Sequence, residues 1–454
     1  MFAGRKKELS YLEESYSQDG SRIIVMYGYR GVGKTTLLKR FAEKKDLTYF
    51  LARPCSDEEE RLIWNRECGG DSVDPEMQEV PSYTDILGRL ISAGGGKKIL
   101  AIDEFQNIIR YSPDFMEQLV NFINASDTQI FCVLLSSSIS FVENDLVPRI
   151  GKYAMSLNGF FKIPELCFLD CVNYFSKYST KQCMEVYGIL GGIPAYWKYF
   201  SDEKDLKSNI ISTFLADGAP LKEEGMRVVS DELRETHVYC TILNCLATDV
   251  CKLNDLHKHT GYARAKISVY LKSLMEMGLA TKVFPFDGAS SINARKGIYR
   301  IPVRLLIFYF RFLYSNASAL EMMNAEDFYE NIVSPGLSEI FKGNFRRVCS
   351  EYLDILSSRH ALPIEVTSSG EWPGKDGDID IIMQNDEEDS LIGFCRWDKG
   401  EMQVSDMDEY YRLIKSASLH PDHIFVFSAG TFSDDLKKSS DLEGNIRLIA
   451  TEDL

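Results

Sequence analysis

The chain has 454 residues and a formal net charge of −16, with 45% hydrophobic and 26% charged residues. This composition excludes bulk disorder, and the length predicts two to four domains. The apolar segment at residues 298–314 carries three arginines, which argues against a membrane span, and the charged N-terminus lacks the apolar run of a signal peptide. Eleven scattered cysteines without a CxxC pair predict reduced thiols in a cytoplasmic protein, and the six histidines predict no metal site of their own.

The negative charge is concentrated in the last third of the chain. Residues 305–454 hold 28 Asp and Glu against 13 Lys and Arg, a balance of −15. Residues 252–304 hold 10 basic against 3 acidic residues, a balance of +7. Such asymmetry predicts that separate domains have separate partners.

The first predicted site follows a strand at residues 22–27, RIIVMY, which leads into GYRGVGKT at 28–35 and then a helical segment. Strand, glycine-rich loop and helix in this order are the setting of a phosphate-binding loop (P-loop), in which backbone N–H groups turn toward the anion. A glycine turn that binds nothing is the alternative, but it leaves both flanking elements unexplained. We expect Lys34 to reach the β- and γ-phosphates of ATP and Thr35 to bind Mg²⁺. The predicted nucleotide contacts are Gly28, Arg30, Gly31, Val32, Gly33, Lys34, Thr35 and Thr36.

A second predicted strand, in KILAIDEF at residues 98–105, ends in two acids. Asp103 at the strand tip is placed to hold Mg²⁺. Glu104 points differently and is placed to polarise the attacking water, a pattern typical of ATP-hydrolysing enzymes rather than kinases. We therefore predict Glu104 and Lys34 as catalytic residues and Thr35 with Asp103 as the metal-binding pair.

A third strand, at residues 130–135, is followed by three serines. A polar residue at this position can sense the γ-phosphate, so Ser137 and Ser138 are candidate sensors, although serines at a strand end are also ordinary turn residues. Between the second and third strands, Ser112 and Pro113 predict the start of a helix. The alternation of strands and helices predicts a doubly wound parallel sheet, an α/β fold.

Four segments together resemble the archaeal-type ATPase family of the STAND class of P-loop ATPases: FAGRKKEL at 2–9, the P-loop, DEFQ at 103–106 and GGIPAYW at 191–197. The resemblance implies that Gly4 and Arg5 lie near the nucleotide base. It also implies that Pro194, in a helical lid, packs against the base or sugar. Without the family, Gly192 and Pro194 would be read as a helix break.

One position departs from the family pattern. Many members carry Gly-Arg shortly after the sensor strand, where this chain has Gly151 and Lys152. Lysine cannot make the bidentate contact that arginine makes to phosphate, and whether nearby Arg149 substitutes stays open. The resemblance therefore implies ATP hydrolysis that is slow.

Residues 235–301 show three helices and a hairpin, which resembles a winged helix-turn-helix. The third helix places Ile267, Tyr270, Leu271 and Leu274 on one face. One hypothesis is duplex DNA binding through phosphate contacts, and the alternative is an inter-domain strut with a solvated basic face. The possible DNA contacts are Arg264, Lys266 and Lys272 on the third helix and Arg295 and Lys296 in the wing.

The last domain alternates helix and strand, beginning with a predicted strand in PIEV at 363–366, and by family resemblance it is similar to the PD-(D/E)xK nuclease fold. Asp378 and Asp380 match its strand acids. The ExK position, however, falls on Phe394 and Arg396, and the helix acid on Arg346. We therefore predict a fold without nuclease activity, unless a shifted register brings in spare acids such as Glu365 or Glu371.

The predicted architecture is a P-loop ATPase core (1–160), a helical lid (161–228), a winged helix with closing helices (229–330) and a nuclease-like domain (331–454). The predicted protein is a slowly hydrolysing switch ATPase that takes ATP and Mg²⁺ and couples nucleotide state to duplex DNA or to an unknown protein partner. Two alternatives stay open: an ATP-dependent DNA-processing nuclease, and an ATP-responsive DNA-binding regulator without turnover.

Overall fold

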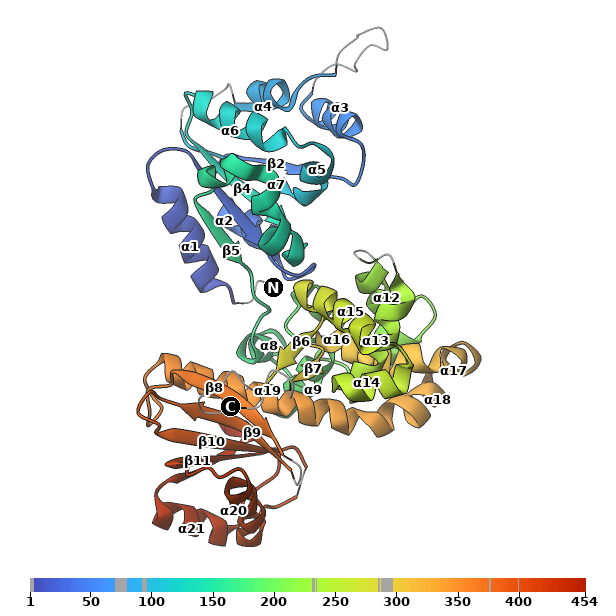
Figure 1. Ribbon diagram of the computed structural model, residues 1–454, viewed down its shortest axis with the longest axis vertical. Coiled ribbons are helices and arrows are strands. Elements are labelled where there is room, and N and C mark those ends of the chain that lie inside the picture. Colours follow the sequence, from blue (N-terminus) through green and yellow to red (C-terminus); the bar gives the residue numbers. More distant parts are fainter. Residues whose placement is uncertain are drawn as a thin grey trace.

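The computed structural model describes residues 4–69, 80–91, 96–230, 233, 235–284, 286, 297–374, 377–398 and 400–454. Figure 1 shows three parts along the longest axis: an N-terminal α/β part, a helical middle part and a C-terminal sheet with its own helices. No helix among the described residues is long and apolar enough to cross a bilayer.

Five parallel strands in the order β2-β3-β4-β1-β5 form the N-terminal sheet, as predicted for a P-loop ATPase core. They are β1 (Arg22–Tyr27), β2 (Leu47–Leu51), β3 (Lys98–Asp103), β4 (Ile130–Ser136) and β5 (Gly159–Lys162). The last strand spans the predicted domain boundary at residue 160. Because β4 lies beside β1, the serines that follow β4 come to the same sheet edge as the P-loop.

Helices cover both faces of this sheet (Figure 1). They are α1 (Lys6–Ser17), α2 (Lys34–Phe41), α3 (Asp57–Glu67), α4 (Tyr83–Ile91), α5 (Gln106–Tyr111), α6 (Phe115–Ala125) and α7 (Leu146–Ile150). Alternate strand residues face opposite layers: Ile24 packs in the cluster that contains Leu37, and Val25 in the cluster that contains Trp64. The helix predicted to start at Ser112 begins later, at Phe115, because residues 113 and 114 form a turn.

The middle part contains the lid and the winged helix. The lid helices are α8 (Phe168–Tyr174), α9 (Thr180–Leu190), α10 (Pro194–Trp197), α11 (Leu206–Ile210) and α12 (Glu224–Ser230). The winged helix has α13 (Thr236–Ala247), α14 (Leu253–Thr260), α15 (Arg264–Glu276) and the antiparallel pair β6 (Thr281–Val283) and β7 (Ile298–Arg300). Ile267, Leu271 and Leu274 are buried, as the predicted helix face requires, and Gly278 ends α15 with a φ of 71°.

Closing helices connect the winged helix to the C-terminal sheet: α16 (Arg304–Phe308), α17 (Ala317–Met322), α18 (Ala325–Phe328) and the long α19 (Leu337–Ser358). One continuous apolar core joins the lid, the winged helix, these helices and the inner face of the C-terminal sheet. The middle and C-terminal parts therefore share a core, whereas the N-terminal sheet has its own.

The C-terminal sheet has the order β12-β11-β10-β9-β8, with β8, β9 and β10 antiparallel and β10, β11 and β12 parallel. Its elements are β8 (Ser368–Pro373), β9 (Asp378–Gln384), β10 (Ser390–Arg396), α20 (Met407–Ser416), β11 (His423–Ser428), α21 (Asp434–Glu443) and β12 (Ile446–Ala450). The strand predicted in PIEV is wrong, because residues 363–366 lie in an irregular segment and the first strand starts at Ser368.

Candidate nucleotide site

The P-loop connects the carboxyl end of β1 to α2, and close packing explains its glycines. Gly28, Gly31 and Gly33 all have positive φ values, of 156°, 80° and 100°. A Cβ on Gly28 would lie 2.5 Å from the carbonyl oxygen of Ile163, and one on Gly31 would lie 2.8 Å from the Ala195 Cβ. The loop therefore needs glycine both for its turn and for its contacts with the lid.

Lys34 begins α2, and its side chain turns back over the loop. Its Nζ donates to the carbonyl oxygens of Gly28 and Tyr29, at 2.9 and 3.1 Å. Burial lowers the pKa of the Lys34 ammonium, while Glu104 and Asp103 oppose this shift. The buried ammonium is therefore held over the loop by two carbonyl acceptors and lies near both predicted acids.

Asp103 and Thr35, the two residues predicted to bind the metal, meet directly. The Thr35 hydroxyl donates to Asp103 Oδ2 at 2.6 Å. Tyr49 on β2 donates to the same oxygen at 2.9 Å, and burial beside Asp103 raises the pKa of Tyr49, so its hydroxyl keeps the donated proton. A hydroxyl and a carboxylate are ligands that Mg²⁺ accepts, so the residues present fit that ion. Tyr49 was missed because no motif marks this edge-strand residue.

Glu104 has a positive φ of 55° and is held by neighbouring donors. Its Oε2 accepts hydrogen bonds from Ser137 N–H at 3.1 Å, Ser137 Oγ at 2.7 Å and Gln106 Nε2 at 2.6 Å. Of the two predicted sensors, only Ser137 contacts this carboxylate. Ser138 is buried, and its N–H donates to Ser136 Oγ instead.

The N-terminal box braces the loop. Arg5 is buried and donates from Nη2 to the carbonyl oxygens of Val32, at 2.9 Å, and Pro164, at 2.8 Å. Its guanidinium thus ties the P-loop to the start of the lid, and Arg5 also lines the cavity over the loop. Gly4 faces the lid as well, since a Cβ there would lie 2.6 Å from Asp170 Oδ1.

The lid closes one side of a cavity of about 500 Å³ over the P-loop. Ala195 N–H donates to the Gly31 carbonyl at 3.2 Å, and the ring of Pro194 would lie 3.7 Å from a Cβ on Gly33. The cavity is lined by Arg5, Arg30, Gly31, Val32, Gly33, Lys34, Thr35, Thr36, Asp103, Glu104, Leu166, Tyr174, Pro194, Ala195 and Lys198.

The cations near residue 150 lie elsewhere. Arg149 and Lys152 are exposed and do not line the cavity, and Lys152 lies over the Tyr153 ring. The lid instead contributes Lys198, an exposed residue directly after α10. No motif marks Lys198, and only the folded lid places it there.

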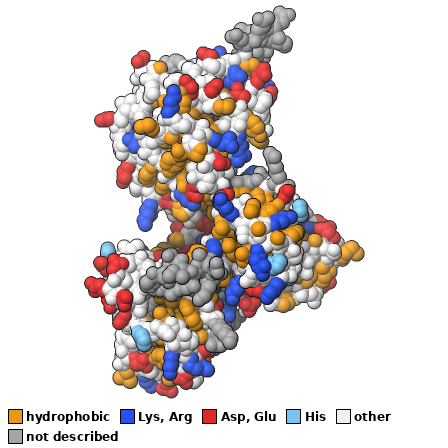
Figure 2. All heavy atoms as spheres, in the orientation of Figure 1, with side chains coloured by type: hydrophobic (Ala, Val, Ile, Leu, Met, Phe, Trp, Pro, Cys, Tyr) orange, Lys and Arg blue, Asp and Glu red, His pale blue; other side chains and the backbone are white. Residues whose placement is uncertain are grey.

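The three described candidates for DNA contact lie on the exposed face of α15. Arg264 donates to Asn254 at 2.8 Å, Lys266 lies over the Tyr262 ring, and Lys272 lies 3.6 Å from Glu276. Val269 between them is 64% exposed. Figure 2 shows Lys and Arg side chains among hydrophobic ones on the face formed by α14 and α15. Arg295 and Lys296 lie outside the described residues.

The nuclease-like edge of the C-terminal sheet is occupied by arginines. Arg346 on α19 lies 3.1 Å from Glu371 and 3.5 Å from Asp380, and Arg300 of the winged helix lies 2.8 Å from Glu371. No group of three or more His, Cys, Asp or Glu side chains that could hold a metal ion occurs in the described part of the chain.

Phe394 does not occupy the expected acid position. It points to the opposite face of the sheet and stacks on Tyr410 with ring centroids 4.1 Å apart. The neighbouring Cys395 meets Asp380 instead, because its N–H donates to Asp380 Oδ2 at 2.8 Å. The predicted register is therefore wrong by one residue, and the residue at this position is a thiol rather than a phenyl ring.

Comparisons with known proteins identify three segments. Residues 2–200 match an ATPase domain found predominantly in Archaea. Residues 240–282 match the bacterial regulatory proteins of the arsR family, and residues 309–408 match a family of archaeal and bacterial proteins of unknown function.

Individual proteins and a solved structure are also similar to this chain. An uncharacterized protein of Methanocaldococcus jannaschii is 25% identical over 425 residues, which cover 91% of this chain and 90% of that one. An uncharacterized ATP-binding protein of the same organism is 45% identical over 47 residues, 10% of this chain and 80% of that one. A Walker-type ATPase of Pyrococcus abyssi has a similar fold, with a TM-score of 0.50 and 15% identity over 68% of this chain and 96% of that one.

Proposed function

We propose that this chain is a slowly hydrolysing ATP switch, because its residues 2–200 match an ATPase domain found predominantly in Archaea. In this proposal, binding and hydrolysis at the P-loop change how the lid, the winged helix and the C-terminal domain are held together. The switch controls contact with duplex DNA or with a protein partner.

One observation carries the proposal: the P-loop itself contacts both the lid and the winged helix. Tyr29 lies inside the loop, and its hydroxyl donates to the carbonyl oxygen of Gly278 at the end of α15. On the other side of the loop, Ala195 of the lid donates to Gly31. A loop that rearranges around phosphates would therefore shift its contacts with both neighbours.

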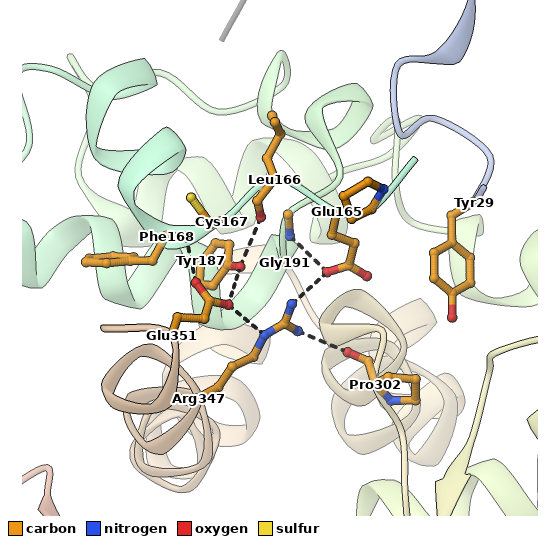
Figure 3. Close-up of polar contacts among 12 residues, drawn as sticks. Tyr29, Glu165, Leu166, Cys167, Phe168, Tyr187, Gly191, Pro302, Arg347 and Glu351 are labelled. Carbon is orange, nitrogen blue, oxygen red and sulfur yellow. Dashed lines mark hydrogen bonds and ion pairs between the residues drawn. The ribbon is translucent and has the colours of Figure 1, made fainter. Parts of the chain in front are cut away.

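A second network supports transmission from the lid to the C-terminal part (Figure 3). Arg347 on α19 contacts Glu165 at the start of the lid, at 3.1 Å, and Glu351 on its own helix, also at 3.1 Å. Glu351 accepts from Tyr187 on α9 at 2.9 Å and from the N–H of Phe168 on α8 at 2.9 Å. Movement of the lid would thus act on the long helix that leads into the C-terminal sheet.

The chemistry follows from the site residues. Lys34 would bind the β- and γ-phosphates, and Glu104 would accept a proton from the attacking water. Thr35 and Asp103 would hold Mg²⁺, which neutralises charge on the phosphates when bound. Slow turnover is proposed because Arg5 is committed to backbone carbonyls, and Arg149 and Lys152 lie outside the cavity.

The strut hypothesis applies to the C-terminal end of α15, and the DNA hypothesis applies to its exposed face. Its C-terminal end is docked on the P-loop through Gly278, as a strut would be. Its exposed face carries three basic residues and no acidic partner for Arg264 or Lys266 in the described residues. We propose that the helix does both and presents a weak, salt-sensitive DNA surface whose position depends on the loop.

The nuclease alternative has less support. Glu371 and Asp380 are the acids that a nuclease metal site would use at this edge of the sheet, and both are paired with Arg346. Burial raises the pKa of Asp380, which Arg346 partly offsets. We propose that this domain contacts a partner and does not cut DNA.

The test is steady-state ATP turnover by the purified full chain at fixed low salt, titrated with duplex DNA, with Glu104→Gln as the catalytic control. Slow turnover that changes with DNA and is lost in the variant supports the switch. Turnover that does not change with DNA would indicate that the partner of the switch is a protein. Nucleotide binding without turnover would favour the regulator alternative.

A further inference from the structure

A second cavity, of about 700 Å³, lies where the lid, the winged helix, α16, α19 and the C-terminal sheet meet. It is separate from the P-loop cavity, since the two share no lining residue. Six cationic side chains line it: Arg300, Arg304, Arg311, Lys342, Arg346 and Arg347.

Four of these cations have carboxylate partners. Arg300 and Arg346 contact Glu371, Arg311 contacts Asp249, and Arg347 contacts both Glu165 and Glu351. These carboxylates are used further, because Glu351 also accepts from Tyr187 and from the Phe168 N–H. The cavity therefore holds several ion pairs, and Lys342 and Arg304 are the two lining cations that have no carboxylate partner among the described residues.

Arg304 is the less exposed of these two cations. It begins α16 and is only partly exposed, and its Nε atom is fully enclosed without a hydrogen-bond partner. None of its five N–H donors has a hydrogen bond or ion pair with a described residue. A guanidinium nitrogen that is buried without an acceptor is costly, and natural structures seldom retain one without a reason.

The surroundings of Arg304 place it beside other charges. A Cβ on Gly191 would lie 3.5 Å from the Arg304 Cβ and 3.6 Å from Glu165 Oε2. Burial lowers the pKa of Arg304 to about 10, repulsion by Arg347 adds to this shift, and the attraction of Glu165 and Glu351 opposes it. Figure 3 shows that the Arg347 guanidinium already donates to Glu165, Glu351 and the Pro302 carbonyl.

We propose that this cavity is a second ligand site, in which Arg304 binds the phosphate of a phosphorylated small molecule. The free donors of Arg304 match the acceptors of a phosphate, which arginine binds in a bidentate manner. A volume of about 700 Å³ is within the range of small-molecule sites and accommodates a ligand up to the size of a mononucleotide.

Such a ligand would stabilise the contacts between segments of the middle and C-terminal parts. It would bridge the closing helix α16, the lid entry at Glu165 and the long helix α19, which are elements of three different segments. The ligand would therefore stabilise the present arrangement of these segments, by mass action on the state that binds it.

The experiment is isothermal titration of inorganic pyrophosphate into the full chain at low salt, compared between the wild type and four variants. Arg304→Met removes the proposed contact, Arg304→Lys keeps the charge, and Lys34→Ala disables the P-loop. Arg412→Met is the matched control, because Arg412 is exposed on α20 and its Nε donates only to the backbone of Asp408.

We expect saturable pyrophosphate binding that Arg304→Met weakens about tenfold or more, whereas Lys34→Ala and Arg412→Met retain it. Arg304→Lys is expected to restore part of the affinity. The melting temperature without pyrophosphate separates a ligand role from a structural one. Removing an uncompensated charge should leave it equal or higher, and pyrophosphate should raise it in the wild type but not in Arg304→Met.

Three results would overturn the proposal. They are absence of saturable binding in the wild type, affinity unchanged in Arg304→Met, and loss of binding in Lys34→Ala alone, which would assign the pyrophosphate to the P-loop. None of these results bears on ATP turnover, so the proposed switch function is tested separately.

Discussion

The two oxygens of the Glu104 carboxylate have different surroundings. Oε2 accepts three hydrogen bonds from Ser137 and Gln106, whereas no described residue donates to Oε1. A carboxylate held by one oxygen presents the other in a fixed direction, as a general base must present it to a water molecule. In the proposed mechanism, Ser137 would therefore orient Glu104, a role that differs from sensing phosphate directly.

Replacing Ser137 by alanine tests this orientation. Ser137→Ala removes the shortest of the serine's two contacts, so kcat should fall about tenfold or more while KM for ATP changes little. Ser138→Ala is the matched control, since Ser138 makes no hydrogen bond to Glu104. Steady-state kinetics of both variants decide the matter, and equal losses would contradict the assignment.

Tyr49 donates to the Asp103 oxygen that is proposed to hold Mg²⁺. Tyr49→Phe removes this donor without a change in size, so the Mg²⁺ concentration for half-maximal turnover should rise severalfold, as for other outer-shell partners. A Mg²⁺ titration of ATP turnover measures the shift, with Tyr111→Phe as an exposed control. An unchanged Mg²⁺ dependence would leave Tyr49 a packing role only.

Lys198 is the lid cation that lines the P-loop cavity. Lys198→Gln should weaken binding of a non-hydrolysable ATP analogue about tenfold and of ADP less, because an additional phosphate adds negative charge for the lysine to attract. Lys204→Gln, an exposed lid lysine outside the cavity, is the control. Equal losses for both nucleotides would show that Lys198 does not distinguish the terminal phosphate.

At the scale of elements, the features that short sequence motifs determine were predicted, and those that depend on contacts between distant residues were not. Short patterns were enough to predict the P-loop, the two acids at the end of β3 and the helices of the winged helix, because the geometry of each is set within a few residues. β8 was misplaced because the β-branched residues Ile364 and Val366 precede the strand, which forms instead in SSGEWP through pairing with β9. Tyr49 and Lys198 could not be predicted, because strand pairing and lid packing bring them to the site.

The exposed face of α15 predicts a salt-dependent interaction. Three basic side chains would release about three counterions from duplex DNA, so log K should fall with log salt with a slope of about −3. Arg264→Ala should reduce the slope by about one and weaken binding to unrelated sequences equally. Fluorescence anisotropy at several salt concentrations measures this, and a slope near zero would leave the helix as a strut.

At the scale of the whole molecule, Tyr29 is the point where nucleotide state would reach the winged helix. Burial raises the pKa of Tyr29, so its hydroxyl is a lasting donor to Gly278. Tyr29→Phe should leave basal ATP turnover within about twofold while reducing the effect of DNA on turnover, since coupling is reciprocal. Tyr199→Phe, on the lid surface, is the control, and an unchanged DNA effect would place the coupling elsewhere.

The arginines over Glu371 and Asp380 also bear on how this protein can evolve. Arg346 comes from α19 and Arg300 from the winged helix, so either one still neutralises Glu371 when the other is replaced. A metal ion would need both guanidiniums removed and a further carboxylate supplied where Cys395 now stands. No single substitution gains anything along that route, so gradual mutation would not readily turn this edge of the sheet into a hydrolytic centre.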